Sequence, residues 1–401
     1  MEMALLSHDS RILTINSGSS SIKFSLYEMG KEEIRLLKGK LDRIGVGDGS
    51  LEVEDDRGNR LITRELDLPD HETALEALFD WLKDQDVGKD MDAVGHRLVH
   101  GGKDHMRPER VSSALIREVK QLIPLAPDHL PHEIRAMEAV FNHFPKRLQV
   151  ACFDTAFHGR MPEAARRYAL PERLTREGLE HYGFHGLSYE YILGELTREA
   201  GTDETPNKLI IAHLGNGASM AAVQAGRSMD TTMGLTPAGG LIMSTRTGDL
   251  DPGVILYLLQ QNRMTPSEVN DLINHQGGLM ALSGISGDMH DLIDRETTQE
   301  QAALAVKMFC YQARKFIGAL AAVLGGLDTM VFTGGIGENA GRIRSRICEP
   351  LEFLGIHLDE RLNRQHAAVI SEENSPVTVR VMKTNEEIMI ARHTNEFLMD
   401  G

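Results

Sequence analysis

The stretch that decides the fold runs from ILTI (residues 12–15) through NSGSSS (16–21) to IKFSLY (22–27). It predicts a strand, a small hydroxyl-rich loop and a second strand. A loop of glycine and serine can present several backbone N–H groups to one anion, and Lys23 adds a positive charge suited to a phosphoryl oxygen. The loop is not a P-loop, because GxxxxGK[ST] is absent, and the alternative is an ordinary polar hairpin turn.

A second copy of this pattern favours the phosphate-binding interpretation. LIIAH (209–213) leads into LGNGAS (214–219), and MAAVQ (220–224) follows as another β-compatible run. A third glycine cluster, TGGIGEN (333–339), follows an expected strand over 329–332 and precedes an expected helix over 340–348. A strand, a glycine turn and a helix start can together bind a nucleotide phosphate through backbone N–H groups and the helix dipole. The two hairpins predict a duplicated fold with one phosphate-binding hairpin in each half.

Eight segments of the chain, in this order, closely resemble the motif set of acetate kinases. They are INSGSSSIK, GHRLVHGG, FDTAFH, HYGFHG, HLGNGAS, TRTGDLDPG, FTGGIGEN and TNEE, and the resemblance extends from residue 11 to about residue 395. The resemblance implies an α/β, duplicated two-domain kinase fold of the sugar kinase, heat-shock ATPase and actin type, with the active site in the interdomain cleft. It also implies an N-terminal acyl- and phosphate-binding domain formed by 1–156 and 387–401, and a nucleotide-binding domain formed by 157–386.

Composition agrees with a globular, two-domain protein. A chain of 401 residues is long for one core, and 41% hydrophobic and 25% charged residues are ordinary proportions. No signal peptide or membrane span is expected, and the three cysteines form no metal-type pair, which favours reduced thiols in the cytoplasm. The formal net charge of −16 makes nucleic-acid binding improbable, so anionic substrates require a local positive island.

The expected elements alternate between strands and helices. Apolar residues at helical spacing predict a helix over 72–83, with Asp70 as its N-cap. The other elements expected are strands over 93–100 and 148–153 and helices over 131–142, 300–324 and 387–399.

Two arginines stand out for anion binding. Arg97 ends an expected strand beside two glycines, where a guanidinium can bind a carboxylate or an acyl phosphate through two hydrogen bonds. The alternative is an ion-paired surface arginine. The resemblance places Arg97 and Arg246 in the active site, where each can neutralise charge on the transferring phosphoryl group. Asp249 and Asp251 are expected to cap the next helix and to orient Arg246 rather than to act chemically.

A histidine and an aspartate complete the catalytic group that the resemblance implies. His185 is expected to donate to the transferring phosphoryl group. Structural roles are expected for His100, His158 and His181. Asp154 occupies the position of the superfamily's catalytic carboxylate. Since an acetate nucleophile is already ionised at neutral pH, we interpret Asp154 as an electrostatic and positioning residue, although the family's usual label is proton transfer.

The resemblance also implies the remaining ligand-binding residues. Mg²⁺, or Mn²⁺ in its place, would be held by Asn16 and Glu386, with Glu387 open as the alternative to Glu386. The acyl pocket would have Val99, Phe184 and Pro237 as apolar walls beside Arg97. The nucleotide-binding residues would be Lys23, His213, Leu214, Gly215, Asn216, Gly217, Asp288, Met289, His290, Gly335, Ile336, Gly337, Glu338 and Asn339.

Three departures from the family pattern bear on substrate choice. Asp128 replaces an acyl-pocket leucine, Ala238-Gly239 replaces a bulkier Leu-Glu pair, and His290 replaces an arginine near the base or ribose. The sequence predicts an ATP-dependent kinase that interconverts acetate and acetyl phosphate, and the resemblance implies that it is a homodimer. A propionate kinase is one alternative, because one methylene changes binding by only about 1–3 kcal/mol. A nucleotide-driven conformational ATPase is the second, but it would have no acyl phosphate for these arginines to bind.

Overall fold

The computed structural model describes residues 9–85, 90–201 and 207–400, and the chain forms two compact units. The first unit comprises Met1–Ala156 and Asn385–Gly401, and the second comprises Phe157–Thr384. The return to the first unit lies two residues earlier than the sequence-based boundary after residue 386. Asn385 belongs with the C-terminal helix because its side chain caps that helix and accepts a hydrogen bond from Ile388 N at 3.1 Å.

The first unit is built on a mixed eight-stranded sheet in the order β5-β4-β3-β2-β1-β6-β8-β7. Strands β1 to β5 form an antiparallel meander, β1, β6 and β8 are parallel, and β7 is antiparallel to β8. The strands are β1 Ser10–Ser17, β2 Ser21–Met29, β3 Glu33–Asp42, β4 Gly49–Asp55, β5 Arg60–Leu66, β6 Ala93–Leu98, β7 Glu109–Arg110 and β8 Leu148–Phe153.

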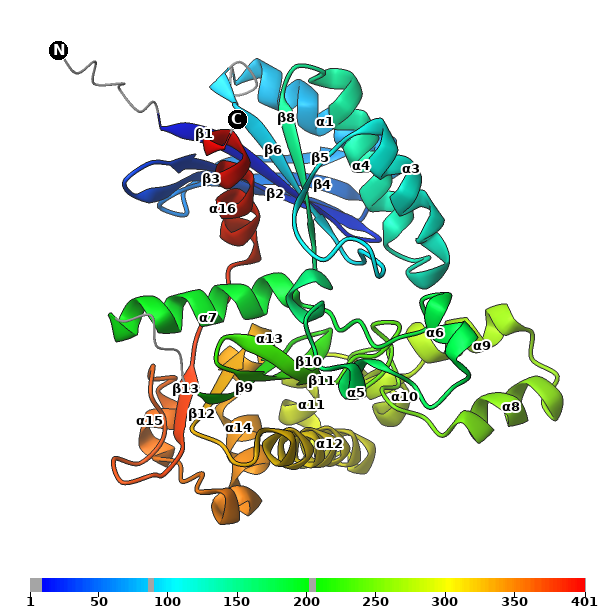
Figure 1. Cartoon of the computed structure of the whole chain (residues 1–401), viewed down its shortest axis with the longest axis vertical. Coiled ribbons are helices and arrows are strands. Elements are labelled where there is room, and N and C mark those ends of the chain that lie inside the picture. Colours follow the sequence, from blue (N-terminus) through cyan, green and yellow to red (C-terminus); the bar gives the residue numbers. More distant parts are fainter. Residues whose placement is uncertain (1–8, 86–89, 202–206, 401) are drawn as a thin grey trace. The chain divides into compact units, whose positions relative to one another are not determined.

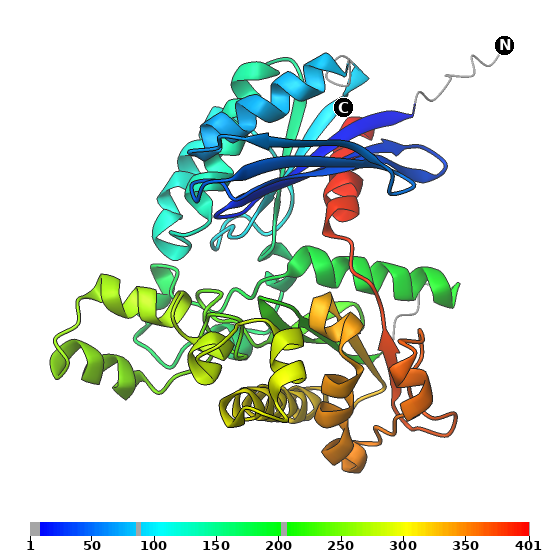
Figure 2. The ribbon, with the colours of Figure 1, turned by 180° about the vertical axis from the view of Figure 1, so that it is seen from behind.

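Helices cover both faces of this sheet (Figures 1 and 2). On one face lie α1 His71–Asp84, α3 Ser113–Gln121 and α4 Leu130–His143, and α16 Glu386–Met399 packs on β1, β2, β6 and β8 from the other. The main core lies under α1 and α4, where helix residues such as Leu75 and Leu78 meet strand residues such as Leu13 and Phe24. Gly95 in β6 permits the close approach of α16, because a Cβ there would lie 2.4 Å from both Ile390 Cγ2 and Thr394 Oγ1.

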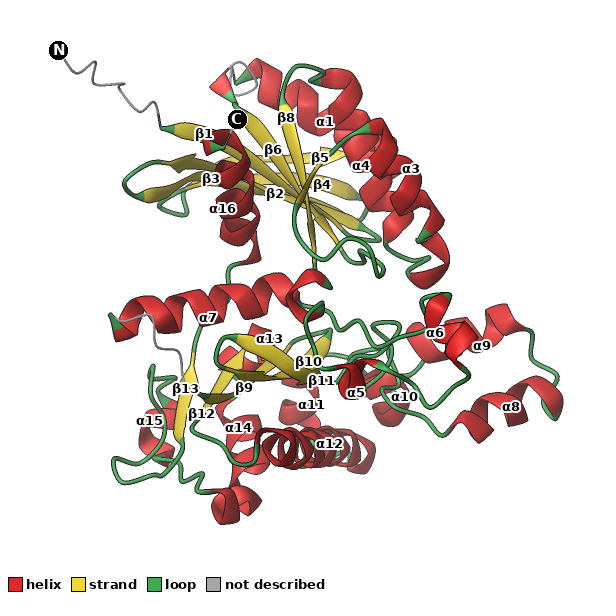
Figure 3. Ribbon diagram, viewed as in Figure 1, coloured by secondary structure: helices red, strands yellow, loops and turns green. Residues whose placement is uncertain are grey.

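The second unit repeats this topology with five strands in the order β11-β10-β9-β12-β13 (Figure 3). An antiparallel β9–β10–β11 meander is extended by parallel strands β12 and β13, as β1–β2–β3 is extended by β6 and β8. The strands are β9 Lys208–Leu214, β10 Ala218–Gln224, β11 Arg227–Thr231, β12 Thr329–Thr333 and β13 Thr378–Val381. The predicted duplication is confirmed.

Helix α7 Gly186–Ala200 covers one face of the second sheet, and α12 Glu300–Leu324 covers the other (Figure 1). Residues of α7 such as Tyr189 and Ile192 pack on Leu209 and Val223 of the sheet. The remaining helices are α5 Glu163–Arg166, α6 Glu172–Arg176, α8 Pro252–Gln260, α9 Pro266–Asn274, α10 Gly278–Ser283, α11 Met289–Arg295, α13 Gly334–Asn339, α14 Gly341–Cys348 and α15 Glu360–Arg364.

Most of the expected elements are present within a residue or two of their predicted bounds. Two differ. Strand β6 ends at Leu98 and not at residue 100, because Val99 N donates to the carboxylate of Glu133 at 2.9 Å instead of continuing the ladder. The glycine run at 334–339 is itself the short helix α13 and not an open turn.

Cys152, Cys310 and Cys348 are buried, and none of the three forms a disulfide within the described residues. No helix in that part of the chain combines the length and apolar composition needed to cross a bilayer.

We expect Gly95→Ala to lower the free energy of unfolding by about 1–3 kcal/mol, the usual cost of overpacking a tight contact. The added methyl group would push α16 away from the sheet. Urea unfolding measures the effect, with Gly318→Ala as the matched control, since a Cβ at Gly318 in α12 meets no atom within 4 Å. Equal unfolding midpoints for Gly95→Ala and the wild type would contradict this account of α16 packing.

Candidate active site

The parallel strands of the first unit bring three of the predicted site residues together. Asn16 lies near the end of β1 and Arg97 near the end of β6, and Asp154 directly follows β8. Arg97 donates to both carboxylate oxygens of Asp154, from Nε to Oδ1 at 3.1 Å and from Nη2 to Oδ2 at 2.5 Å. Its third nitrogen, Nη1, donates to Asn16 Oδ1 at 3.1 Å. The side chain of Arg97 is 16% exposed, so Arg97 is a largely buried residue with a fixed orientation, not a surface arginine.

A second carboxylate approaches the same guanidinium. Glu386, the first residue of α16, has Oε2 3.8 Å from Arg97 Nε. Burial alone would lower the pKa of Arg97, but the Coulomb attraction of Asp154 and Glu386 outweighs it and raises that pKa. Burial raises the pKa of Glu386, against the opposing effect of Arg97. The cluster thus holds two carboxyl groups around one permanent cation.

Glu133 of α4 is a functional candidate that the sequence did not reveal. Its carboxylate Oε2 accepts from Val99 N, and its Oε1 has no hydrogen-bond partner among the described residues. The side chain is 2% exposed. Burial raises the pKa of Glu133 to about 8, against the opposing effect of Arg97. A buried glutamate inside a helix resembles any solvated helix residue in sequence, so no local pattern marked it.

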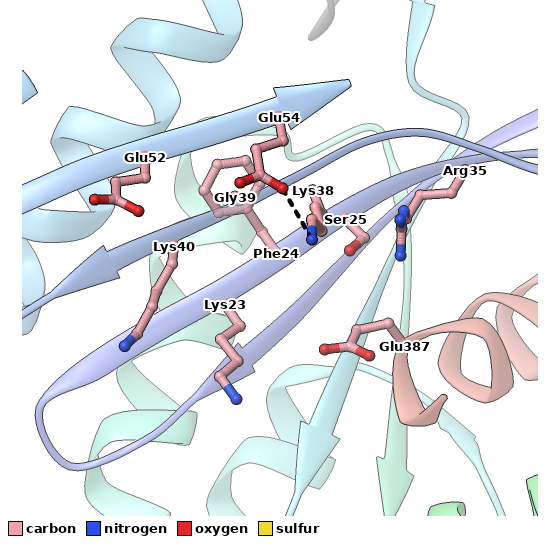
Figure 4. A pocket seen from close by; sticks show the side chains of 10 residues that line it. All are labelled: Lys23, Phe24, Ser25, Arg35, Lys38, Gly39, Lys40, Glu52, Glu54 and Glu387. Carbon is pink, nitrogen blue, oxygen red and sulfur yellow. Dashed lines mark ion pairs between the residues drawn. The ribbon is translucent and has the colours of Figure 1, made fainter. Parts of the chain in front are cut away.

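Lys23 and Glu387 lie together beside a different feature of the first unit. Both line a pocket of about 350 Å³ on the face of β2, β3 and β4, with Lys38, Lys40 and other charged residues (Figure 4). Glu386, by contrast, lies with Asn16 around Arg97. The structure therefore separates the two glutamates that the sequence left as alternatives.

In the second unit, two glycine loops lie side by side at the ends of parallel strands. Thr333 at the end of β12 pairs with His213 of β9, so the loops after these strands leave the sheet at the same edge. Gly334 has φ +76° and lies so close to Leu214 that a Cβ would be 2.8 Å from Leu214 O. Glu338 closes the second of these loops, because its Oε1 accepts from Gly334 N at 3.0 Å.

His185 and Arg246 converge on the glycine loop that follows β9. A Cβ at Gly217 would lie 3.3 Å from His185 Nε2 and 3.9 Å from Arg246 Nη1. His185 precedes α7 in the left-handed conformation, at φ 60° and ψ 25°, which is sparsely populated by residues other than glycine and often marks a functional position. The loop is held from its other side by Ser244 N, which donates to Asn216 O at 3.1 Å.

His213 stacks on His185, with ring centroids 4.3 Å apart and planes at 17°. The Nδ1 atoms of the two rings contact buried serines: His185 contacts Ser219 and His213 contacts Ser188, each at 2.8 Å. A Cβ at Gly215 would lie 3.9 Å from His213 Nε2 and 3.9 Å from Gly335 N. The sequence did not identify Ser188 and Ser219, because a serine inside a helix or a strand carries no signal of its own.

The apolar wall candidates are distributed over both units. Val99 is buried in the first unit, and Phe184 and Pro237 are buried in the second. The carbonyl of Phe184 lies 3.1 Å from His158 Nε2, and that of Pro237 accepts from Arg246 Nη1 at 3.4 Å. His158 is fully buried and burial lowers its pKa to about 4, in keeping with a structural role.

Several aspartates have capping or bridging contacts. Asp251 caps α8 through Gly253 N, as predicted, and Asp288 caps α11 through His290 N. Asp249 does not cap this helix; its carboxylate accepts from Gly240 N at 2.7 Å and so joins the two ends of the 240–249 loop.

Of the other predicted nucleotide-binding residues in this region, Met289 is buried and His290 is exposed. Burial lowers the pKa of His132 to about 4, and the half-buried Asp128 opposes this shift.

Comparison with known proteins agrees with this arrangement. The model of the acetokinase family matches residues 11–392. The chain belongs to the acetokinase family. A relative described as acetate kinase from Rhodopseudomonas palustris (strain TIE-1) is 43% identical over 387 residues, which covers 95% of this chain and 97% of the relative.

Solved structures from this family have the same fold. The crystal structure of Porphyromonas gingivalis acetate kinase has a TM-score of 0.88 at 39% identity and covers 97% of this chain and 100% of its own. A propionate kinase from Francisella tularensis subsp. tularensis has a TM-score of 0.90 at 34% identity, covering 96% and 99%. Membership makes this protein a phosphotransferase with a carboxyl group as acceptor, on the duplicated α/β kinase fold.

We expect the stability of the wild type to fall, relative to Glu133→Gln, as pH rises from 5 to 8. The pKa of Glu133 is raised to about 8 in the folded chain, so its proton stabilises the fold fully below about pH 4.5 and this contribution is lost as pH rises toward 8. Glutamine keeps the shape and the acceptor for Val99 N but does not titrate. Urea midpoints at pH 5, 7 and 8.5 measure the difference, and parallel pH curves would contradict it.

Proposed function

We propose that the protein catalyses reversible phosphoryl transfer between ATP and acetate, giving acetyl phosphate and ADP by direct in-line transfer. A carboxylate oxygen of acetate attacks the γ-phosphorus while the bond to the bridging oxygen of ADP breaks. No proton has to move, so the protein's task is to position both substrates and stabilise charge. The observation that carries the proposal is the convergence of His185 Nε2 and Arg246 Nη1 on the glycine loop at Gly217.

In the first unit, Arg97 is the proposed donor to acetate or acetyl phosphate. Its fixed orientation supports this role, since Asp154 and Asn16 hold all three of its nitrogens. Asp154 then acts through Arg97: it orients the guanidinium and balances its charge, and it is a positioning residue. Its two hydrogen bonds from Arg97 support this role over that of a general base.

In the second unit, His185 and Arg246 are the proposed donors to the oxygens of the transferring phosphoryl group. Positive or donor groups placed before the reaction at the site of developing charge are an effective source of transition-state stabilisation. The nucleotide phosphates and base would lie along the loops of 213–217 and 335–339, beside Asp288, Met289 and His290, with Lys23 as a further cation from the first unit. The position of these two glycine loops, side by side at the carboxyl ends of the parallel strands β9 and β12, supports this assignment.

Asn16 and Glu386 fit a hard divalent cation, and we assign them Mg²⁺. Both supply side-chain oxygen atoms as ligands, and the cluster around Arg97 holds more carboxyl groups than basic groups, which favours a cation. Among the described residues no group of three or more His, Cys, Asp or Glu side chains is arranged to hold a metal ion. A nucleotide-bound Mg²⁺ that keeps its waters needs only one or two such ligands, and when bound it would neutralise charge on the phosphates.

Propionate is the second candidate acceptor. Ala238 and Gly239 stand where a bulkier pair is usual, and Gly239 borders a cavity of about 470 Å³ that Tyr168 and Asp249 also line. An acyl-phosphate assay with acetate, propionate and butyrate tests both candidates. The highest kcat/KM with acetate supports the proposal, and a higher value with propionate would replace it.

We also propose a cytoplasmic homodimer. The second unit exposes large apolar side chains on α8 and α12, including Leu256 and Tyr257 on the first and Tyr311 on the second, all more than half exposed. Exposed apolar side chains of this size often belong to self-association surfaces. Three buried cysteines without a disulfide are in keeping with a reducing compartment.

We expect Arg97→Ala and Arg246→Ala each to lower kcat for acetyl phosphate formation at least a hundredfold. Loss of a charged contact made in the transition state costs about 2.7 kcal/mol or more. Added guanidinium should restore part of the activity. Arg64→Ala, on the exposed edge strand β5, is the matched control and should retain full activity. Near-wild-type turnover of both active-site variants would rule out these two donors.

We expect Asp154→Asn to slow both reaction directions comparably and to leave the shape of the pH profile unchanged. Asparagine keeps the size of aspartate but loses its charge and half of its capacity to hold Arg97. A general base would instead give a wild-type acid limb in kcat that disappears in the variant. Rate profiles between pH 5 and 9 in both directions distinguish these two roles.

A further inference from the structure

Two buried serines hold the stacked histidines of the second unit in a crossed arrangement. Helix α7 and the residue before it carry His185 and Ser188, and the β9–β10 hairpin carries His213 and Ser219, which are directly opposite each other in the ladder. His185 Nδ1 lies 2.8 Å from Ser219 Oγ, and His213 Nδ1 lies 2.8 Å from Ser188 Oγ. Each structural element thus supplies the serine that orients the other element's histidine.

Each serine has a second hydroxyl as its neighbour. Tyr189 Oη forms a hydrogen bond with Ser219 Oγ, and Thr384 Oγ1 donates to Ser188 Oγ at 2.8 Å. Ser188, Ser219 and Tyr189 are fully buried. A buried hydroxyl that leaves its only proton unused is costly, and each hydroxyl can donate just once. The direction of each hydrogen bond therefore fixes the direction of the next.

We propose that Tyr189–Ser219 and Thr384–Ser188 are two hydroxyl relays that hold His185 and His213 as neutral imidazoles protonated on Nε2. The inference rests on the proposed role of His185 as a donor to the phosphoryl group. A phosphoryl oxygen only accepts, so the nitrogen that faces it must carry a proton. In the neutral ring Nδ1 then accepts from Ser219, and Ser219 accepts from Tyr189.

The second relay runs in the same sense. Thr384 donates to Ser188, so Ser188 is left to donate to His213 Nδ1. Its Nε2–H then faces the glycine loop at Gly215, as that of His185 faces Gly217. Thr384 is itself fixed to the third glycine cluster, because its backbone N donates to Glu338 Oε1 at 3.3 Å. One network therefore connects both histidines with the loops proposed to bind phosphate.

The surroundings of His185 favour the neutral form. Two imidazolium rings at a centroid distance of 4.3 Å would repel each other, and the guanidinium of Arg246 approaches the same glycine as His185, so a positive charge on His185 is disfavoured. The left-handed conformation of His185 also needs neighbours to hold it, and the contact with Ser219 provides one. Ser219, Ser188, Tyr189 and Thr384 are thus positioning residues that act through the histidines.

The test is ¹⁵N NMR of the full-length protein with labelled histidine, at pH 7 and without substrate. Variants His185→Gln and His213→Gln assign the two signals. We expect both rings to be neutral with the proton on Nε2. We expect Ser219→Ala to abolish this preference at His185 alone, and Ser188→Ala, the matched variant, to abolish it at His213 alone. An imidazolium or an Nδ1-protonated His185 in the wild type would overturn the proposal.

Kinetics provide the functional readout. We expect Ser219→Ala to lower kcat at least tenfold with KM for acetate changed less than twofold, and Ser219→Thr, which returns the hydroxyl, to recover most of the loss. Tyr189→Phe removes only the last hydroxyl and should lower kcat severalfold, which keeps the test available if Ser219→Ala does not fold. If the tautomer of His185 were the same as in the wild type in both Ser219→Ala and Tyr189→Phe, the relay would be overturned. Full turnover by His185→Ala would instead overturn the proposed role of His185 and leave the NMR result standing.

Discussion

The register of the parallel strands is the constraint on which the rest of the structure depends. In the first unit, β1, β6 and β8 end at one edge of the sheet, and this alone brings Asn16, Arg97 and Asp154 together from positions far apart in the chain. In the second unit, the pairing of β9 with β12 places two glycine loops side by side. Ligands of open α/β sheets bind outside the carboxyl ends of parallel strands, and both units have their unusual residues there.

Charge explains why Arg97 is largely withdrawn from solvent, with its side chain 16% exposed, beside the fully buried Asp154. The chain carries a formal charge of −16, yet all of its proposed substrates are anions. An exposed arginine on such a surface would be screened by salt and by neighbouring acids. Arg97 avoids this because Asp154 and Asn16 fix its orientation inside the unit. Replacing only Arg97 or only Asp154 would be destabilising, because the remaining partner would keep its charge without a counter-charge.

The sequence predicted those parts of the fold that depend on local signals. The two hairpins, the helix capped by Asp70 and the long helix ended by Gly325 all have patterns of apolar spacing or caps that act within a few residues. The parts it missed depend on contacts between distant residues. Helix α13 is an example: glycine disfavours helix, but Arg344 donates to the carbonyls of Gly337 and Glu338 and so satisfies its last turn.

The same division applies to the candidate site. The sequence alone identified arginines beside glycines and glycine clusters after strands as candidates, because few purely structural roles require these patterns. His185 was selected from 17 histidines only by its motif, and nothing in the sequence marked Ser188, Ser219, Tyr189 or Glu133.

Those missed residues share one property: each is a buried polar group whose hydrogen-bond partner is more than 20 residues away. A transferring phosphoryl group needs donors that do not move while its charge shifts between oxygens. An imidazole on an exposed turn could rotate or change its protonation state. Distant buried hydroxyls prevent both, and this is why the residues that make His185 a dependable donor are the ones that sequence patterns do not reveal.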